Sequence, residues 1–68
     1  MKPVSGKQMC RLLEAKGWEL KRINGSHHIY AKPDSEVRIS IPVHGGTALK
    51  IGLQKHVMKL ANIDESEL

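Results

Sequence analysis

The dipeptide Asn24-Gly25, set between two segments of alternating apolar and polar residues, constrains the fold of this chain more than any other feature. Both central residues of a type I′ turn need positive φ, which Asn and Gly tolerate best, so the pair predicts a tight β-hairpin. The segment 18–24 places Trp18 and Leu20 on one face, which indicates a half-buried strand. A second strand, roughly residues 27–32, is expected after the turn.

A third strand is predicted after the break at Pro33-Asp34-Ser35. From Val37 to Val43 apolar and polar residues alternate almost without interruption, and four β-branched residues fall on one face. Because β-branched side chains suit a half-buried pleated surface, this segment is the clearest strand of the chain.

Helices are predicted on both sides of the strands. Ser5 and Gln8 form a capping box, which predicts a helix with Met9, Leu12 and Leu13 on its buried face and Gly17 at its end. A second helix, beginning between residues 47 and 51, is predicted from apolar residues at helical spacing. Its buried face is expected to carry Leu49, Leu53, Val57 and Leu60, and its outward face Lys50, Gln54, Lys55 and Lys59.

The order of elements is therefore α-β-β-β-α, in a single domain of the α+β class that spans residues 1–68. We expect a three-stranded antiparallel sheet with both helices on one face, the topology of double-stranded-RNA-binding domains. Residues 64–68 either add a short helical turn or fray. A chain of 68 residues buries only a thin core, so any chemistry is expected on a surface or in a shallow groove.

The charge of the chain favours a polyanionic partner. Eleven Lys and Arg residues stand against seven Asp and Glu, a formal net charge of +4, but three of the acids lie in the last five residues, so residues 1–63 carry +7. A body this basic attracts nucleic acid, or an acidic protein that competes for the same face. The single Cys10 cannot form an internal disulfide, and neither a signal peptide nor a membrane span is recognisable, so we expect a cytoplasmic protein.

Two adjacent histidines follow the turn, and strand alternation separates them. His27 and His28 point to opposite faces of the second strand. We expect His28 and Tyr30 to share a face and to serve the structure, although the intervening Ile29 would suit the core as well.

His27 is the better candidate for chemistry because it lies nearest the turn. Gly25 lets a ligand approach the backbone there, and Ser26 offers a hydroxyl and an N–H group to a phosphate oxygen. Histidine is the side chain that most readily takes up and releases a proton near neutral pH.

The other polar residues point to RNA held by its backbone. The candidates for phosphate contacts are Lys21, Arg22, Lys32, Lys50 and Lys55. Each of them singly is better explained as a solvated surface charge, and only together do they fit a surface that follows the phosphates. The histidines His27, His28, His44 and His56 lack a recognisable ligand spacing, so no metal site is predicted. Trp18 and Tyr30 are the only aromatic residues and both suit the core, so recognition by base stacking is not expected.

Four short motifs together resemble the HicA (YcfA-like) family of toxin mRNA interferases. They are Gly17-Trp18, Gly25-Ser26-His27-His28-x-Tyr30, Ile41-Pro42-Val43-His44 and Lys50-x-Gly52-Leu53. The resemblance covers nearly the whole chain. It implies a fold like that of double-stranded-RNA-binding domains, metal-independent cleavage of mRNA without a cofactor, and neutralisation by a HicB antitoxin in a complex larger than a dimer. The family's catalytic histidine falls on His27, and the glycine of its motif on Gly25.

RNA carries its own nucleophile, the 2′-hydroxyl, so cleavage needs a base for its proton, cationic groups near the phosphate and a proton for the leaving 5′-oxygen. One histidine could do the first of these jobs and also the last. Products ending in 2′,3′-cyclic or 3′-phosphate are then expected. Two other functions also fit the residues. A non-catalytic double-stranded-RNA-binding module would keep its affinity for duplex RNA after His27→Ala, and a basic protein-interaction domain would bind an acidic partner and ignore RNA at physiological salt.

Overall fold

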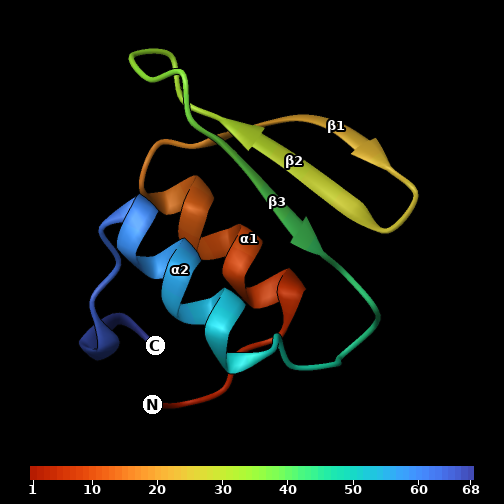
Figure 1. Cartoon of the computed structure of the whole chain (residues 1–68), viewed down its shortest axis with the longest axis vertical. Helices are drawn as coiled ribbons and strands as arrows, with labels where there is room; N and C mark the ends of the chain where they lie inside the picture. Colours follow the sequence, from red (N-terminus) through yellow and green to blue (C-terminus); the bar gives the residue numbers. More distant parts are fainter.

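Two helices cover one face of a three-stranded antiparallel sheet in the computed structural model of the chain, which describes residues 1–68 (Figure 1). The elements are, in chain order, α1 (Gly6–Ala15), β1 (Glu19–Asn24), β2 (His27–Ala31), β3 (Arg38–Pro42), α2 (Ile51–Ala61) and a short 3₁₀ helix, η1 (Glu65–Glu67). The strands follow one another in the sheet in the order β1-β2-β3, so β2 is central. The predicted α-β-β-β-α fold is confirmed.

The start and end of α1 follow from local chemistry. The Ser5 hydroxyl accepts a hydrogen bond from the Gln8 amide at 3.2 Å, and the Gln8 side chain accepts one from the Ser5 amide at 2.9 Å. This capping box satisfies two of the free amides of the first turn. Gly17, with φ of +92°, turns the chain out of the helix as predicted. Between these ends Met9 and Leu13 are fully buried against the sheet.

The strand β1 is exposed along its whole length, which corrects the expectation of a half-buried strand. Trp18 is buried, but it precedes the strand, whereas Leu20 and Ile23 are 43% and 55% exposed. The reason is the strand order: β1 lies at an edge of the sheet, and the helices leave most of it uncovered. An irregularity in the pairing between Leu20 and Arg22 also bends this edge.

The buried face of α2 also differs from the prediction. Its buried residues are Gln54, Val57, Met58 and Ala61, whereas Leu60 is 40% exposed. The helix begins only at Ile51, so the buried Leu49 belongs to the preceding loop and does not mark the helical face. A polar residue, Gln54, therefore occupies a fully buried position that was predicted to face outward.

Gln54 fastens the N-terminal segment to α2. Its side-chain oxygen accepts a hydrogen bond from the Val4 amide at 3.2 Å, and its side-chain nitrogen donates to the Lys2 carbonyl at 2.7 Å. The Val4 carbonyl in turn accepts from the Leu49 amide at 2.8 Å. Both polar atoms of the amide group are thus hydrogen-bonded, which explains how a polar side chain with no exposed surface is tolerated.

Replacing Gln54 with Met is expected to lower the free energy of unfolding by about 1–3 kcal/mol, because the volume is kept while the buried Val4 amide loses its acceptor. Urea denaturation measures the change. Lys59→Met, at an exposed position of the same helix, is the matched control and should change stability by less than about 0.5 kcal/mol. Equal stability of the Gln54→Met variant and the wild type would contradict this role.

Residues 64–68 form a short helical turn, so of the two expectations for this segment the helical one is correct. Asp64 caps η1, and Glu67 forms an ion pair with Lys16 at 2.7 Å. The hydrogen bond from Lys16 holds the pKa of Glu67 below its ordinary value. The C-terminal segment is thereby held against the end of α1.

Candidate active site

His27 is exposed at the first position of β2, on the sheet face that the helices leave open. It pairs with Asn24 on β1 and with Pro42 on β3. The two neighbouring strands therefore hold the backbone of His27 on both sides, while its imidazole remains accessible. An accessible side chain on a rigid strand is suited to meeting a substrate in a defined orientation.

His28 and Tyr30 share the opposite, helix-facing side, as predicted. Their partners on β3 are Ile41 and Ile39, which are both buried. The Tyr30 hydroxyl donates a 2.6 Å hydrogen bond to Glu14 on α1. Burial, together with this bond to a carboxylate, raises the pKa of Tyr30 far above its ordinary value. Tyr30 thus joins the sheet to α1, and only one of the adjacent histidines, His27, is left on the open face.

The turn before His27 differs from the predicted type I′ turn, because Asn24 pairs with His27 at the end of β1 and has no positive φ, so Gly25 and Ser26 are the central residues. Gly25 has φ of +64°, and a Cβ atom there would meet no atom within 4 Å. The residue after it, Ser26, is tied to the end of β3, because its carbonyl accepts a hydrogen bond from the Val43 amide at 2.8 Å. The tip of the hairpin is therefore fixed against the end of β3, next to His27.

This connection brings a further residue, His44, to the site. The Ser26 hydroxyl oxygen lies 3.5 Å from Nε2 of His44. Sequence reasoning considered His44 only as a metal ligand and as part of the Ile41-Pro42-Val43-His44 motif. The register between the second and third strands would have shown that His44 lies near Ser26, but the alternation of residues in the sequence does not determine that register.

A hollow of about 350 Å³ opens between the end of β3 and the start of α2. It is lined by Pro42, His44, Thr47, Ala48, Leu49, Lys50 and Leu53. Since Pro42 is the cross-strand partner of His27, this hollow begins beside the candidate catalytic residue. Of the predicted phosphate-binding residues, Lys50 is the one that lines it.

A second hollow, of about 440 Å³, lies on the open face of the sheet and is lined by Lys21, Arg22, Ile29 and Arg38. Ile29 stands two residues after His27 on the same face of β2. Arg38 was missed by sequence reasoning, because only the pairing of β2 with β3 brings it beside Arg22. Lys21 forms an ion pair with Glu19 at 2.9 Å, so its charge is partly compensated.

Two predicted phosphate-binding residues lie away from His27. Lys32 follows the opposite end of β2, where its ammonium stands 6.0 Å from the centre of the Trp18 ring. Lys55 is exposed on α2, five residues after Lys50. Gly25 and Ser26 therefore adjoin His27 in the turn, Lys50 lines the hollow that begins at Pro42, and Lys32 and Lys55 line neither hollow.

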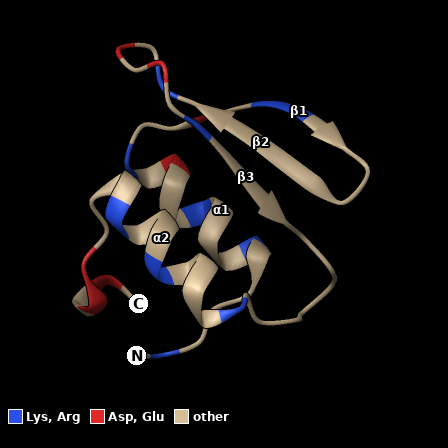
Figure 2. Cartoon of the chain, in the orientation of Figure 1, with Lys and Arg blue, Asp and Glu red and all other residues tan.

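The surroundings of His27 carry no negative side chains. Residues 20–33 and 37–63 contain neither Asp nor Glu. Figure 2 shows that the hairpin turn, the end of β3 and the start of α2 are free of acidic residues. The acids gather instead in the C-terminal turn, in the loop between β2 and β3, and near the end of α1. A positive potential without local compensation favours the approach of a polyanion.

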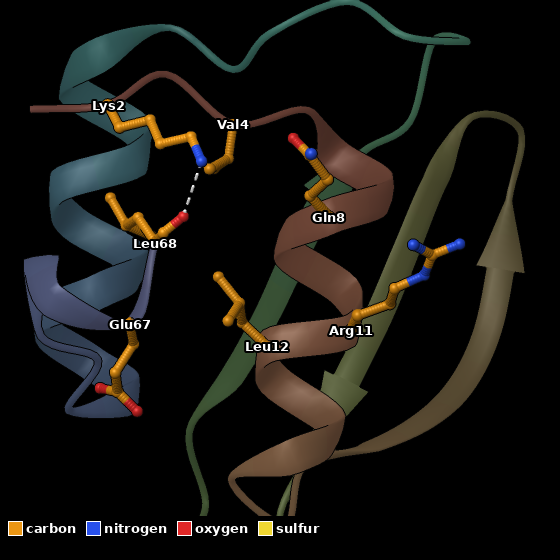
Figure 3. A pocket seen from close by; sticks show the side chains of 7 residues that line it. All are labelled: Lys2, Val4, Gln8, Arg11, Leu12, Glu67 and Leu68. Atoms are coloured by element: carbon orange, nitrogen blue, oxygen red, sulfur yellow. Dashed lines mark hydrogen bonds between the residues drawn. The ribbon is translucent and has the colours of Figure 1, made fainter.

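Figure 3 shows a third hollow, of about 240 Å³, between α1, the N-terminal segment and the C-terminal turn. Leu12 of α1 points into the gap toward the C-terminal segment, and Lys2 donates a 3.0 Å hydrogen bond to the Leu68 carbonyl. No histidine lines it. It is therefore a packing gap between segments and does not extend the site at His27.

The remaining reactive groups lie apart from His27. Cys10 is buried in α1, and burial raises the pKa of its thiol, so it stays protonated. No three side chains among His, Cys, Asp and Glu are grouped so that they could hold a metal ion. Neither helix has the length and apolar character needed to cross a membrane.

Comparison with known families gives one match. The model of the HicA toxins of bacterial toxin–antitoxin systems matches residues 6–63, which include both helices, all three strands and the His27 turn. None of the curated proteins matches the chain at a significant level.

Proposed function

Because the chain belongs to the HicA toxin family of bacterial toxin–antitoxin systems, we propose that it is an endoribonuclease that cleaves mRNA with His27 and without a metal ion. As a toxin of this family it has an antitoxin partner. The observation that carries the proposal is the place of His27, an exposed imidazole beside the Gly25-Ser26 turn on the cationic open face of the sheet.

The chemistry needs few groups. His27 takes the proton of a ribose 2′-hydroxyl, whose oxygen forms a bond to the adjacent phosphorus while the bond from phosphorus to the 5′-oxygen breaks and that oxygen takes up a proton. Ser26 offers a hydroxyl, and Lys50 a positive charge, to the phosphate oxygens on which negative charge grows. The products are a 2′,3′-cyclic phosphate and a 5′-hydroxyl. DNA lacks the nucleophile and is not a substrate.

The RNA chain is expected to run over the open face of β2. It passes from His27 across Ile29 to the hollow lined by Arg22 and Arg38, which would each contact a phosphate. Since both aromatic rings are buried, binding relies on the backbone rather than on stacking of bases. Lys32 and Lys55 would contact RNA only outside this path.

Arg38→Ala is expected to weaken RNA binding and to lower the slope of log Kd against log salt concentration by about 0.7, the value for one lost phosphate contact with a single strand. Fluorescence anisotropy with labelled RNA at several salt concentrations measures this, in a His27→Ala background that prevents cleavage. Lys59→Ala, on the outward face of α2, is the control of equal charge. The same loss in both variants would show a general charge effect and would contradict the proposed path.

The cytoplasm, where mRNA is found, is the proposed location. We further propose that the partner is a HicB-like antitoxin that covers His27, since access to that side chain is what the reaction requires.

Incubation of the purified protein with labelled RNA in EDTA tests the proposed function. We expect the RNA to be cut and a DNA strand of the same sequence to remain intact. Loss of cleavage in EDTA that is restored by a divalent cation would contradict the metal-independent mechanism, and equal cutting of the DNA strand would exclude the 2′-hydroxyl as nucleophile.

A further inference from the structure

Backbone hydrogen bonds before and after the side chain of His44 fix this residue near the hairpin tip that carries His27. The Val43 amide donates to the Ser26 carbonyl at 2.8 Å, which extends the pairing of β2 with β3 by one residue beyond Pro42. The His44 carbonyl accepts from the Thr47 amide at 3.0 Å, which closes the following turn. The backbone at His44 is thus fixed, while its side chain is exposed.

The imidazole of His44 points toward the hairpin tip. Its Nε2 lies 3.5 Å from the Ser26 hydroxyl oxygen, at the upper limit for a hydrogen bond, so the ring is near the tip without being firmly bound to it. It also lines the 350 Å³ hollow together with Lys50. His44 is therefore at once near Ser26, accessible to solvent and beside a cation.

From this arrangement we propose that His44 is the second catalytic group, the acid that protonates the leaving 5′-oxygen; this inference rests on the proposed ribonuclease function. Cleavage needs a proton at the leaving oxygen as well as a base at the 2′-hydroxyl, because an alkoxide is a poor leaving group. As the phosphorus–oxygen bond breaks, its electrons remain on the 5′-oxygen, which takes a proton from the His44 imidazolium. His27 gains a proton and His44 loses one, so the step balances without a further reactant.

No carboxylate and no other histidine in the neighbourhood can take this role. Residues 20–33 and 37–63 contain no carboxylate. His28 lies on the helix-facing side of β2, and His56, exposed on α2, lines none of the hollows. His44 is the histidine whose ring lies near Ser26, the residue before His27. The hollow that it lines has room for the nucleotide on the leaving side, whose phosphate Lys50 would hold.

A substrate with sulfur in place of the bridging 5′-oxygen, at the bond that the wild type cleaves, separates an acid from a merely structural residue. A thiolate leaves without being protonated, because thiols are far stronger acids than alcohols. For His44→Ala we expect cleavage of ordinary RNA to be about 10²–10⁴-fold slower than for the wild type, and cleavage of the sulfur-containing RNA to be within about tenfold of it. His27→Ala should be slow on both substrates.

Two further variants complete the test. His44→Gln keeps a hydrogen-bonding side chain near Ser26 but cannot transfer a proton, so it should be as slow as His44→Ala on ordinary RNA. His56→Ala is the matched control for loss of an exposed histidine and should behave as the wild type on both substrates. Thermal unfolding of each variant verifies that the fold is retained.

The outcomes distinguish this inference from the proposed function. If His27 is required and His44→Ala cleaves ordinary RNA as fast as the wild type, the ribonuclease stands and the role of His44 is refuted. If His44→Ala is slowed equally on both substrates, or His44→Gln restores activity, His44 only positions other groups. A wild type that cleaves neither substrate refutes the ribonuclease and the role of His44 together.

Discussion

Replacing His27 with Ala is expected to slow RNA cleavage by about 10²–10⁴-fold, the usual contribution of a positioned general acid or base. The side chain is exposed, so the fold should be unchanged. Single-turnover cleavage of labelled RNA in EDTA measures the rate constant. RNA affinity, measured separately, should stay within about threefold, because the phosphate contacts come from other residues.

The control for this prediction is His56→Ala, which removes an exposed histidine from α2, outside the site. It should retain the wild-type rate. Equal rates for the wild type and the His27→Ala variant would remove His27 from the mechanism. If the wild type and the variant bind RNA equally well and neither cleaves it, the result would instead favour a non-catalytic RNA-binding module.

Replacing Gly6 with Ala is expected to destabilise the fold by about 1–3 kcal/mol, the usual cost of an extra methyl group in a packed interior. Gly6 is buried at the start of α1, where a Cβ atom would overlap the carbonyl oxygen of Pro42 and lie 3.2 Å from the Cα of Val43. Both are backbone atoms at the end of β3, so no side chain can move aside. Thermal or urea unfolding measures the loss.

The same substitution should also reduce activity, since Pro42 is the cross-strand partner of His27 and Val43 is hydrogen-bonded to Ser26. Gly52→Ala is the matched control, because Gly52 lies in the first turn of α2 with no atom within 4 Å of the added Cβ. It should stabilise the protein by about 0.5–1 kcal/mol. A Gly6→Ala variant as stable as the wild type would show that α1 does not approach β3 as closely as this structure places it.

The parts of the fold that sequence predicted correctly depend on local chemistry. The hairpin at Gly25, the capping box at Ser5 and the alternation in residues 37–43 each depend on a few neighbouring residues, and each occurs as expected. The turn type does not, because the central residues are Gly25 and Ser26 and Asn24 has no positive φ. The topology followed, because three short strands joined by tight connections have few ways to pair.

The errors arose where distant segments decide the outcome. The alternation around Leu20 correctly indicated a strand, but only the reach of the helices determines that its apolar face stays uncovered. Gln54 is polar, and only the backbone of the N-terminal segment, about fifty residues away in sequence, makes its burial favourable. Neither fact is present in the local pattern of the residues concerned.

The residues of the candidate site also fall into those that the sequence could predict and those that only the tertiary structure brings together. His27 could be selected from sequence because turn, glycine and histidine are contiguous. Arg38 and His44 could not, since they join the site through the pairing of β3 with β2 and through the bond between Val43 and Ser26. Strand register is a tertiary property, and the candidate site is assembled mainly by it.

Identification of the product ends tests most directly whether this protein cleaves RNA through the 2′-hydroxyl. Wild-type protein is incubated with a defined RNA in EDTA, and the fragments are analysed by mass spectrometry. We predict 2′,3′-cyclic phosphate or 3′-phosphate at one end and 5′-hydroxyl at the other. Fragments with 3′-hydroxyl and 5′-phosphate ends would contradict the mechanism, because water rather than the 2′-hydroxyl would then be the nucleophile.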